Sequence, residues 1–252
     1  MSRLLVIPAA GLGSRLKTST PKPLVAVNGR PMLDHLFDLY RPHVERMVVV
    51  AHPSFLPDIE RWAEGKDMVD VTTQGSPTGM LDAILLAMPF IELHEPESVW
   101  ITWCDQVGVL RETLGLLAAR TRSNPPPALA LPTVQRRAPY IHLVRNREGR
   151  IVEVLHKREG DQLPSEGESD MGVFALSRDA YERLLPEYAR EVTVGRGTGE
   201  RNFLPFIAWL VGRGVPLLTF PCTDPMEAIG INTPEELTLV EGWLRTRSSR
   251  PS

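Results

Sequence analysis

The chain has 252 residues, of which 42% are hydrophobic and 23% are charged, and its formal net charge at pH 7 is −3. This length suits one large α/β domain or two small ones, and the charge argues against a general nucleic-acid binder, which needs a basic surplus. No apolar run approaches the roughly 20 residues of a membrane helix, so no membrane partner is expected. The N-terminus lacks a cleavage signal, and Cys104 and Cys222 lack metal-site spacing, which favours reduced thiols in a cytoplasmic protein.

The first 135 residues alternate between short apolar runs and amphipathic stretches. The apolar runs are rich in branched side chains, which is typical of buried parallel strands. The predicted strands are Arg3–Pro8, Met47–Ala51, Val69–Thr73, Val99–Trp103 and Ala128–Pro132, and the predicted helices are Met32–Tyr40, Pro57–Glu64 and Gly79–Met88. This alternation predicts an α/β fold with a mostly parallel sheet flanked by helices.

From about residue 140 the pattern changes to short strands with hairpin-type connections. Strands are predicted at Ile141–Arg145, Gly149–Leu155 and Gly172–Leu176, and they indicate a small β-rich lobe inserted before the sheet is completed. The polar segment Arg158–Ser169 predicts an exposed loop. Further along, we expect helices at Asp179–Tyr188 and Phe203–Arg213, a strand at Val215–Phe220, a helix at Pro234–Thr246 capped by Thr233, and a frayed tail.

A glycine-rich segment, Pro8-Ala-Ala-Gly-Leu-Gly-Ser-Arg-Leu16, follows the first predicted strand. Backbone N–H groups in such a turn can hold polyphosphate. The segment is not a dinucleotide fingerprint, because Leu16 takes the place of the last glycine, and it is not a P-loop, because no Gly-Lys-Ser/Thr follows. Arg15 and Lys22, the latter within Pro21-Lys-Pro23, would add two cations beside the glycines, and a triphosphate carries enough negative charge to need both.

These residues resemble the sugar-phosphate nucleotidyltransferases, whose N-terminal signature is a Gly-x-Gly-x-Arg loop followed by Pro-Lys and a hydrophobic residue. The resemblance implies a Rossmann-like, mostly parallel mixed sheet flanked by helices, with a small β-rich acceptor-binding lobe. It also implies that Ala10, Gly11 and Gly13 bind the nucleotide, and that Arg15 and Lys22 are catalytic residues that stabilise charge around the α-phosphate.

A second segment, Gln74-Gly-Ser-Pro-Thr-Gly79, looks like the base-binding stretch of the uridylyl- and thymidylyltransferases. In those enzymes a glutamine reads the pyrimidine edge and a glycine admits the ring, so Gln74 and Gly79 are the expected nucleotide contacts. An amide offers one donor and one acceptor, which matches uracil or thymine and favours UTP or dTTP. The alternative interpretation, which is compatible with base binding, is a turn and helix start in which Thr78 or Ser76 caps a helix from Gly79.

An acid, Asp105, ends the apolar run Trp100-Ile-Thr-Trp-Cys-Asp105 at the carboxyl edge of the predicted sheet, where ligands of open α/β sheets bind. The resemblance makes Asp105 a ligand of Mg²⁺, the expected cofactor, together with an oxygen late in the chain. That second ligand is expected to be Asn232, because an amide oxygen suits a hard cation, and Asp224 is the alternative.

On the acceptor side the resemblance is less complete. The acceptor-binding residues that it implies are Lys157, Asp170, Gly172 and Glu200. The family's glutamate before the lysine falls on Leu155 or His156, depending on register. Asp170 stands where the family has asparagine, and an ionised carboxylate accepts hydrogen bonds but cannot donate them.

The implied reaction transfers a nucleoside monophosphate from an NTP to a sugar 1-phosphate and releases pyrophosphate. One domain is expected, with residues 1–135 binding the nucleotide, 136–232 binding the acceptor and 233–252 forming a C-terminal helix and tail. The expected partners are the NTP and a small phosphorylated metabolite, and assembly with further copies of the chain stays open. Three alternatives stay open: cytidylyl transfer to a non-sugar phosphate such as phosphocholine, a glycosyltransferase, whose usual second acid is replaced here by Val107, and a non-catalytic nucleotide-binding domain.

Overall fold

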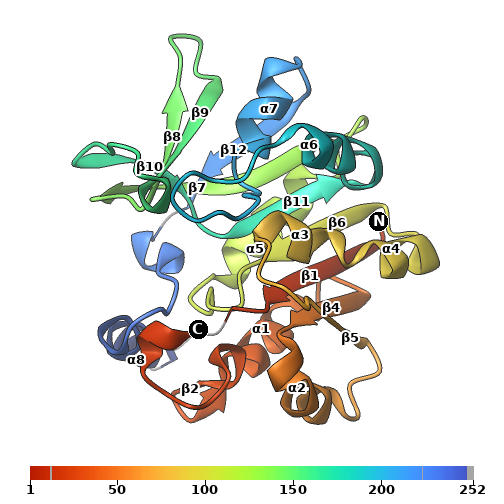
Figure 1. Cartoon of the computed structure of the whole chain (residues 1–252), viewed down its shortest axis with the longest axis vertical. Coiled ribbons are helices and arrows are strands. Elements are labelled where there is room, and N and C mark those ends of the chain that lie inside the picture. The colour runs from red at the N-terminus through yellow and green to blue at the C-terminus, as the bar shows by residue number, and fades with distance from the viewer. Residues whose placement is uncertain (12, 223, 249–252) are drawn as a thin grey trace.

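The computed structural model describes residues 1–11, 13–222 and 224–248, with Ser14 and Ser248 described by their backbone alone. Within this part of the chain an eight-stranded sheet forms the centre of the molecule, in the order β10-β7-β11-β6-β1-β4-β5, with β12 paired to β7 (Figure 1). The strands are β1 (Arg3–Ala9), β4 (Arg46–Ala51), β5 (Val69–Thr73), β6 (Ser98–Thr102), β7 (Leu129–Arg137), β10 (Glu166–Asp170), β11 (Val173–Ser177) and β12 (Leu217–Pro221). The pairs β1–β4, β1–β6, β4–β5 and β7–β12 are parallel, whereas β10 and β11 run antiparallel to their neighbours.

Successive residues of the central strands point to opposite faces of the sheet, so each face carries its own apolar core. On β1, Leu5 and Ile7 face one cluster and Leu4 and Val6 face the other. The first cluster takes side chains from α1 (Met32–Tyr40), α2 (Leu56–Ala63), α5 (Arg111–Arg120) and α8 (Pro234–Ser248). The second takes them from α3 (Met80–Leu85), α4 (Met88–His94), a π-helical turn (Ala180–Leu184), α6 (Leu185–Glu191) and α7 (Phe206–Gly212).

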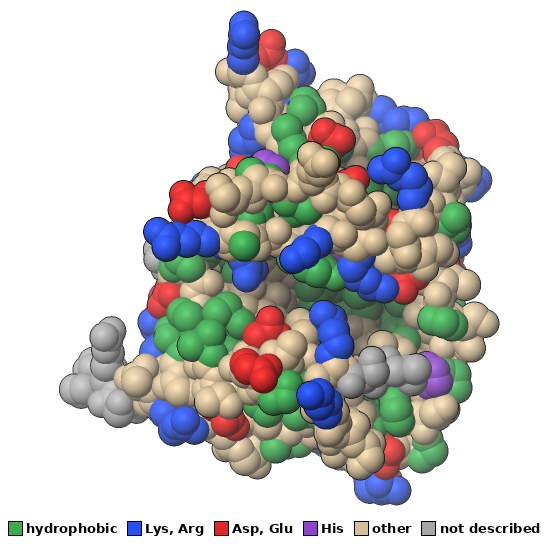
Figure 2. Space-filling model, turned by 60° about the vertical axis from the view of Figure 1, so that its left-hand side comes forward, with side chains coloured by type: hydrophobic (Ala, Val, Ile, Leu, Met, Phe, Trp, Pro, Cys, Tyr) green, Lys and Arg blue, Asp and Glu red, His purple; other side chains and the backbone are tan. Residues whose placement is uncertain are grey.

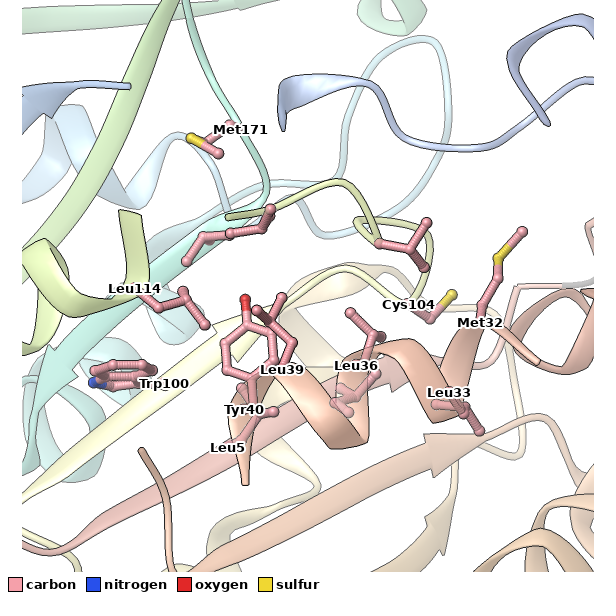
Figure 3. Close-up of a cluster of buried hydrophobic side chains, with 14 of the residues drawn as sticks. Leu5, Met32, Leu33, Leu36, Leu39, Tyr40, Trp100, Cys104, Leu114 and Met171 are labelled. Carbon is pink, nitrogen blue, oxygen red and sulfur yellow. The ribbon is translucent and has the colours of Figure 1, made fainter. Parts of the chain in front are cut away.

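The packing of α1 illustrates how the sequence pattern produces this layer. Leu33, Leu36 and Tyr40 recur at helical spacing, and each is fully buried. Figure 3 shows them beside Leu5 of β1, with Trp100 of β6 at the end of the row. The rings of Tyr40 and Trp100 meet edge to face, with centroids 6.3 Å apart.

The α/β architecture that the sequence predicted is confirmed, and most elements lie within a few residues of their expected places. The loop expected over Arg158–Ser169 is wrong at its end, because Glu166–Asp170 forms β10 on the edge of the sheet, paired with β7. The single helix expected over Gly79–Met88 is divided into α3 and α4. Helix α5 was not predicted at all, and residues 249–252 of the expected tail lie outside the described residues.

The β-rich lobe predicted after residue 140 is smaller than expected. Strands β8 (Ile141–Arg145) and β9 (Ile151–His156) form a separate antiparallel hairpin that stands away from the main sheet in Figure 1. The strand predicted at Gly172–Leu176 belongs instead to the main sheet as β11, between β6 and β7. A further short pair, β2 (Ala26–Val27) and β3 (Arg30–Pro31), precedes α1. No helix among the described residues is long and apolar enough to cross a membrane.

Candidate active site

The turn after β1 is open at one glycine and tightly packed at another. Gly13 has a φ of +63°, and a Cβ added there would lie 2.7 Å from the Cβ of Lys22. A larger residue would therefore strain the backbone and displace the lysine. A Cβ added at Gly11 would meet nothing within 4 Å, and the neighbouring Ala10 is partly exposed. A ligand can thus approach the backbone at Gly11, while the absence of a side chain at Gly13 lets the turn pack against Lys22.

Four of the predicted residues, Arg15, Lys22, Asp105 and Asn232, meet in one group, here called the charge cluster. The ammonium of Lys22 donates to Asp105 Oδ2 at 2.5 Å and to Asn232 Oδ1 at 2.7 Å. Arg15 Nη2 donates to the same Asn232 oxygen at 3.0 Å. The side chains of Lys22 and Asp105 are 12% and 11% exposed, so little water screens their charges.

Local structure sets the position of Lys22 and Asp105. Lys22 begins a 3₁₀ turn, Lys22–Leu24, between two prolines whose φ angles are fixed by their rings. Asp105 follows the end of β6, at the carboxyl edge of the parallel strands, as the sequence predicted. The fold therefore brings a cation and an anion from different segments to the same edge of the sheet.

Asn232 is held by the start of α8. The Glu236 carboxylate accepts from the Asn232 backbone N–H at 2.7 Å. It also accepts from the Thr233 backbone N–H at 3.0 Å, while Thr233 Oγ1 accepts from the Glu236 backbone N–H at 3.3 Å. This reciprocal arrangement is a capping box, and it confirms the predicted cap at Thr233. The Asn232 amide also donates to the Gly230 carbonyl at 3.1 Å, which leaves its oxygen facing Lys22.

The charge cluster has the donor chemistry that a divalent cation requires. Asp105 and Asn232 each present an oxygen to one ammonium, so the two oxygens can hold a hard cation in its place. Asp224, the alternative ligand, instead accepts from the Met226 backbone N–H at 2.9 Å and pairs with Arg247 at 3.6 Å. No three His, Cys, Asp or Glu side chains gather as a metal cage in the part of the chain that the structure describes. A cation held by two protein oxygens would take its remaining ligands from phosphate and water.

Electrostatics keep Lys22 charged in this setting. Burial lowers the pKa of Lys22, but the adjacent Asp105 carboxylate outweighs it and raises the pKa above its usual value. Burial raises the pKa of the neighbouring Cys104 thiol to about 12, so this thiol is neutral at pH 7. Cys104 and Cys222 are both unbridged, as expected.

Residues 74–79, here called the base loop, connect β5 to α3. Gln74 is 7% exposed, and its amide Nε2 donates to the Gly79 carbonyl at 3.0 Å. Gly79 has a φ of +125°, a value that side-chain-bearing residues rarely adopt. The alternative interpretation, a cap from Thr78 or Ser76, is wrong, because α3 begins after Gly79 without a side-chain hydrogen bond to its first turn. The Gln74 amide therefore fixes the shape of the loop at Gly79.

The acceptor residues lie in three places. Asp170 ends β10, is 7% exposed, and accepts from the Gly172 backbone N–H at 2.8 Å. Burial raises the pKa of Asp170 to about 6. Gly172 has a φ of +69° and leaves no room for a Cβ against the ring of Trp103, two residues before the Asp105 of the charge cluster. Gly172 thus connects the acceptor side to the charge cluster.

Lys157 and Glu200 lie on neighbouring turns. Lys157 starts the 3₁₀ turn Lys157–Glu159 after β9, and its side chain is exposed. Glu200 pairs with Arg158 of this turn at 3.3 Å. The face of the molecule drawn in Figure 2 is hollowed near its centre, with Lys and Arg side chains beside the hollow.

A comparison with known families agrees with this geometry. A model described as "MobA-like NTP transferase domain" matches residues 5–169, more than half of the chain. The chain belongs to this family. It is therefore a nucleotidyltransferase, and the matched segment contains Arg15, Lys22 and Asp105.

The nucleotidyltransferase is also similar to curated relatives. "Bifunctional protein GlmU" of Thermodesulfovibrio yellowstonii is 28% identical over 246 residues, which cover 96% of this chain and 52% of the relative. The protein of the same name in Pseudomonas paraeruginosa is 29% identical over 237 residues, which cover 92% of this chain and 49% of the relative. The chain spans about half the length of the curated relatives that it matches.

Two charged residues near the predicted site were not found by sequence reasoning. Glu159 accepts several hydrogen bonds from the loop before α7, and Arg201 of that loop contacts the base loop. Glu159 stands in no motif and reaches a distant segment through its carboxylate, whereas Arg201 lies beside the predicted contact Glu200 and meets the base loop through its backbone N–H and carbonyl. The cluster of glycines at 195, 197 and 199 was the available signal, since glycines mark close approach of a backbone.

Proposed function

We propose that this nucleotidyltransferase transfers a nucleoside monophosphate, from UTP or dTTP, to a sugar 1-phosphate and releases pyrophosphate. Residues 1–135 bind the nucleotide, and residues 136–232 bind the acceptor. The observation that carries the proposal is the charge cluster, in which Arg15, Lys22, Asp105 and Asn232 meet from separate parts of the chain. The similarity to two proteins named GlmU supports a sugar phosphate as the acceptor.

The chemistry needs alignment and charge neutralisation more than it needs a protein nucleophile. An oxygen of the acceptor phosphate attacks the α-phosphorus, a new P–O bond forms, and the bond from the α-phosphorus to the bridging oxygen breaks as pyrophosphate leaves. Ala10, Gly11 and Gly13 receive the triphosphate, and Gln74 with Gly79 receives the base. Arg15 and Lys22 are placed to neutralise charge around the α-phosphate, where it increases in the transition state.

Asp105 and Asn232 would hold Mg²⁺ in this proposal. The ion would supply further neutralisation of the phosphate oxygens. In the structure both oxygens bind the Lys22 ammonium, so nucleotide and metal binding require that Lys22 turn from these oxygens to the phosphates. On the acceptor side, Lys157 would meet the acceptor phosphate, and Asp170, Gly172 and Glu200 would contact its remaining groups.

Pyrophosphate release tests the proposal. The purified chain is incubated with Mg²⁺, each of UTP, dTTP, CTP, ATP and GTP, and each of glucose 1-phosphate, N-acetylglucosamine 1-phosphate and phosphocholine. We expect release with a uridine or thymidine nucleotide and a sugar 1-phosphate, and none after EDTA. Release that needs no acceptor would contradict the transfer, because it would indicate hydrolysis.

A second candidate is nucleotidyl transfer to a phosphorylated amino alcohol such as phosphocholine. It is favoured by Asp170, a carboxyl where the resembled family has an amide, because a carboxylate can face a cationic group. The same panel distinguishes the two candidates, since this one requires turnover with phosphocholine and none with the sugar phosphates.

A further inference from the structure

One loop touches both halves of the proposed site. It comprises residues 195–202 between α6 and α7 and is here called the bridge loop. Its backbone is closed on itself, since the Gly195 N–H donates to the Glu200 carbonyl at 2.8 Å and the Gly199 N–H donates to the Gly195 carbonyl at 2.9 Å. The loop therefore has a defined shape of its own, and a displacement at one of its contacts can be passed to another.

A single carboxylate after the β8–β9 hairpin holds the bridge loop. Glu159 accepts from the Gly197 backbone N–H at 2.8 Å, from Thr198 Oγ1 at 2.6 Å and from Asn202 Nδ2 at 2.9 Å. Its side chain is 11% exposed. Burial alone would raise the pKa of Glu159, but these hydrogen bonds outweigh it and lower the pKa to about 2. The carboxylate is ionised at neutral pH, and hydrogen bonds to a charged acceptor are the strong ones.

Two glycines of the bridge loop make this contact close. A Cβ added at Gly195 would overlap the Glu159 carboxylate, and a Cβ added at Gly197 would overlap the Arg158 carbonyl oxygen. Glycine is therefore needed at position 197 for the loop backbone to lie against the turn after β9, and a side chain at position 195 would displace the Glu159 carboxylate.

Arg201 of the bridge loop holds the base loop. Its backbone N–H donates to the Thr78 carbonyl at 2.8 Å, and its carbonyl accepts from the Leu81 N–H at 3.2 Å. Its guanidinium pairs with Asp82 of α3. A Cβ on Gly79 would overlap the Arg201 backbone, so the base loop and the bridge loop lie in direct contact.

This contact reaches the residue that is proposed to read the base. Gln74 Nε2 donates to the carbonyl of Gly79, and Gly79 is pressed against Arg201. A displacement of the bridge loop would move Gly79 and change where the Gln74 amide points. Glu200, a proposed acceptor contact, lies next to Arg201 and pairs with Arg158, next to Glu159.

We propose that Glu159 and Arg201 are positioning residues for nucleotide binding, which act through the bridge loop on the base loop. This inference rests on the proposed function, because it assumes that the base loop receives the nucleotide. It makes a residue of the acceptor lobe a determinant of nucleotide affinity without any contact to the nucleotide.

The test is nucleotide affinity in the absence of any acceptor, measured by titration calorimetry with Mg²⁺ and UTP, dTTP or CTP, whichever binds the wild type most tightly. In Glu159→Gln an amide N–H₂ faces donors in place of one carboxylate oxygen. We expect its Kd to rise about 10-fold, the loss of one hydrogen bond to a charged group, while kcat at saturating nucleotide stays within about threefold. Glu153→Gln is the matched control, because Glu153 is exposed on β9 of the same hairpin, and its Kd should equal that of the wild type.

Arg201 supplies a second measurement that a general loss of stability would not reproduce. Arg201→Gln should raise the nucleotide Kd. Arg201→Lys, which keeps the charge facing Asp82, should have a Kd close to that of the wild type. If Glu159→Gln does not fold, Thr198→Ala removes one of the hydrogen bonds and should raise the Kd by about threefold. The inference is overturned if the folded Glu159 or Thr198 variant matches Glu153→Gln, or if Arg201→Lys and Arg201→Gln are equally impaired. A wild type that binds no nucleotide would instead refute the proposed function.

Discussion

The charge cluster and the acceptor side are built in different ways. In the charge cluster, side chains from four segments bind one another directly, with donor–acceptor distances of 2.5–3.0 Å. On the acceptor side, no hydrogen bond or ion pair among the described residues joins Lys157, Asp170 and Glu200 to one another, and Glu159 and backbone groups fix the geometry. Side-chain hydrogen bonds therefore set the geometry of the proposed nucleotide and metal half, whereas loop packing sets that of the proposed acceptor half.

Removing the charge of Lys22 gives the sharpest test of the first half. In Lys22→Met the α-phosphate loses a buried cation, and we expect kcat to fall by about 10³-fold. Lys66→Met is the control, because Lys66 lies at the end of α2 against Trp62 and Phe37, and its kcat should be unchanged. If Lys22→Met kept more than a tenth of wild-type activity, the charge cluster would not be the reaction centre.

The second metal ligand can be decided by two matched substitutions. Asn232→Ala removes an oxygen that faces Lys22, and we expect kcat to fall by about 10²-fold with a higher Mg²⁺ requirement. Asp224→Ala removes a carboxylate that caps a neighbouring turn, and we expect less than about a threefold change in kcat. The measurement is the initial rate as a function of Mg²⁺ concentration. A larger loss of kcat in Asp224→Ala than in Asn232→Ala would assign the ligand role to Asp224.

Asp170 tests whether burial governs the acceptor half. Its pKa is raised from 3.8 to about 6, so the carboxyl ionises in the unfolded chain at a lower pH than in the folded chain. The free energy of unfolding therefore decreases between pH 3.8 and about 6, and it stays lower at higher pH. A pKa shift of this size corresponds to a loss of about 3 kcal/mol in the free energy of unfolding. Asp170→Asn should therefore be more stable than wild type at pH 8 by about this amount, and equal to it below pH 4. Denaturant unfolding at both pH values measures the difference, and a gain independent of pH would show that the carboxyl is not perturbed.

A smaller effect is expected at the junction between the two halves. In Gly79→Ala the new methyl overlaps the Arg201 backbone at a φ that alanine rarely adopts. We expect the KM for the nucleotide to rise about 10-fold with kcat little changed, because the base loop must move away from the bridge loop. Gly75→Ala, in the same loop with nothing within 4 Å of its added Cβ, is the control. Equal KM values for the two variants would show that the contact between the base loop and the bridge loop does not affect nucleotide binding.

The two halves also differ in what the sequence could predict. Lys22 and Asp105 were found because a motif and the end of a strand place them at one sheet edge, and the sheet itself follows from branched apolar runs such as Met47–Ala51. The strand β10 was missed because Glu166–Asp170 is polar and glycine-containing, and its pairing with β7 is a tertiary contact that no local pattern encodes. Glu159 was missed for the same reason, since its hydrogen-bond donors lie more than 35 residues further along the chain.

The fate of the α-phosphate tests the central claim most directly. UTP labelled with ³²P at the α-position is incubated with the wild type, Mg²⁺ and N-acetylglucosamine 1-phosphate or glucose 1-phosphate, and the products are separated. The account predicts that the label moves into a nucleoside diphosphate sugar, with one pyrophosphate released for each molecule formed. Label recovered as UMP with either acceptor would contradict it, because the nucleotide would then have been transferred to water.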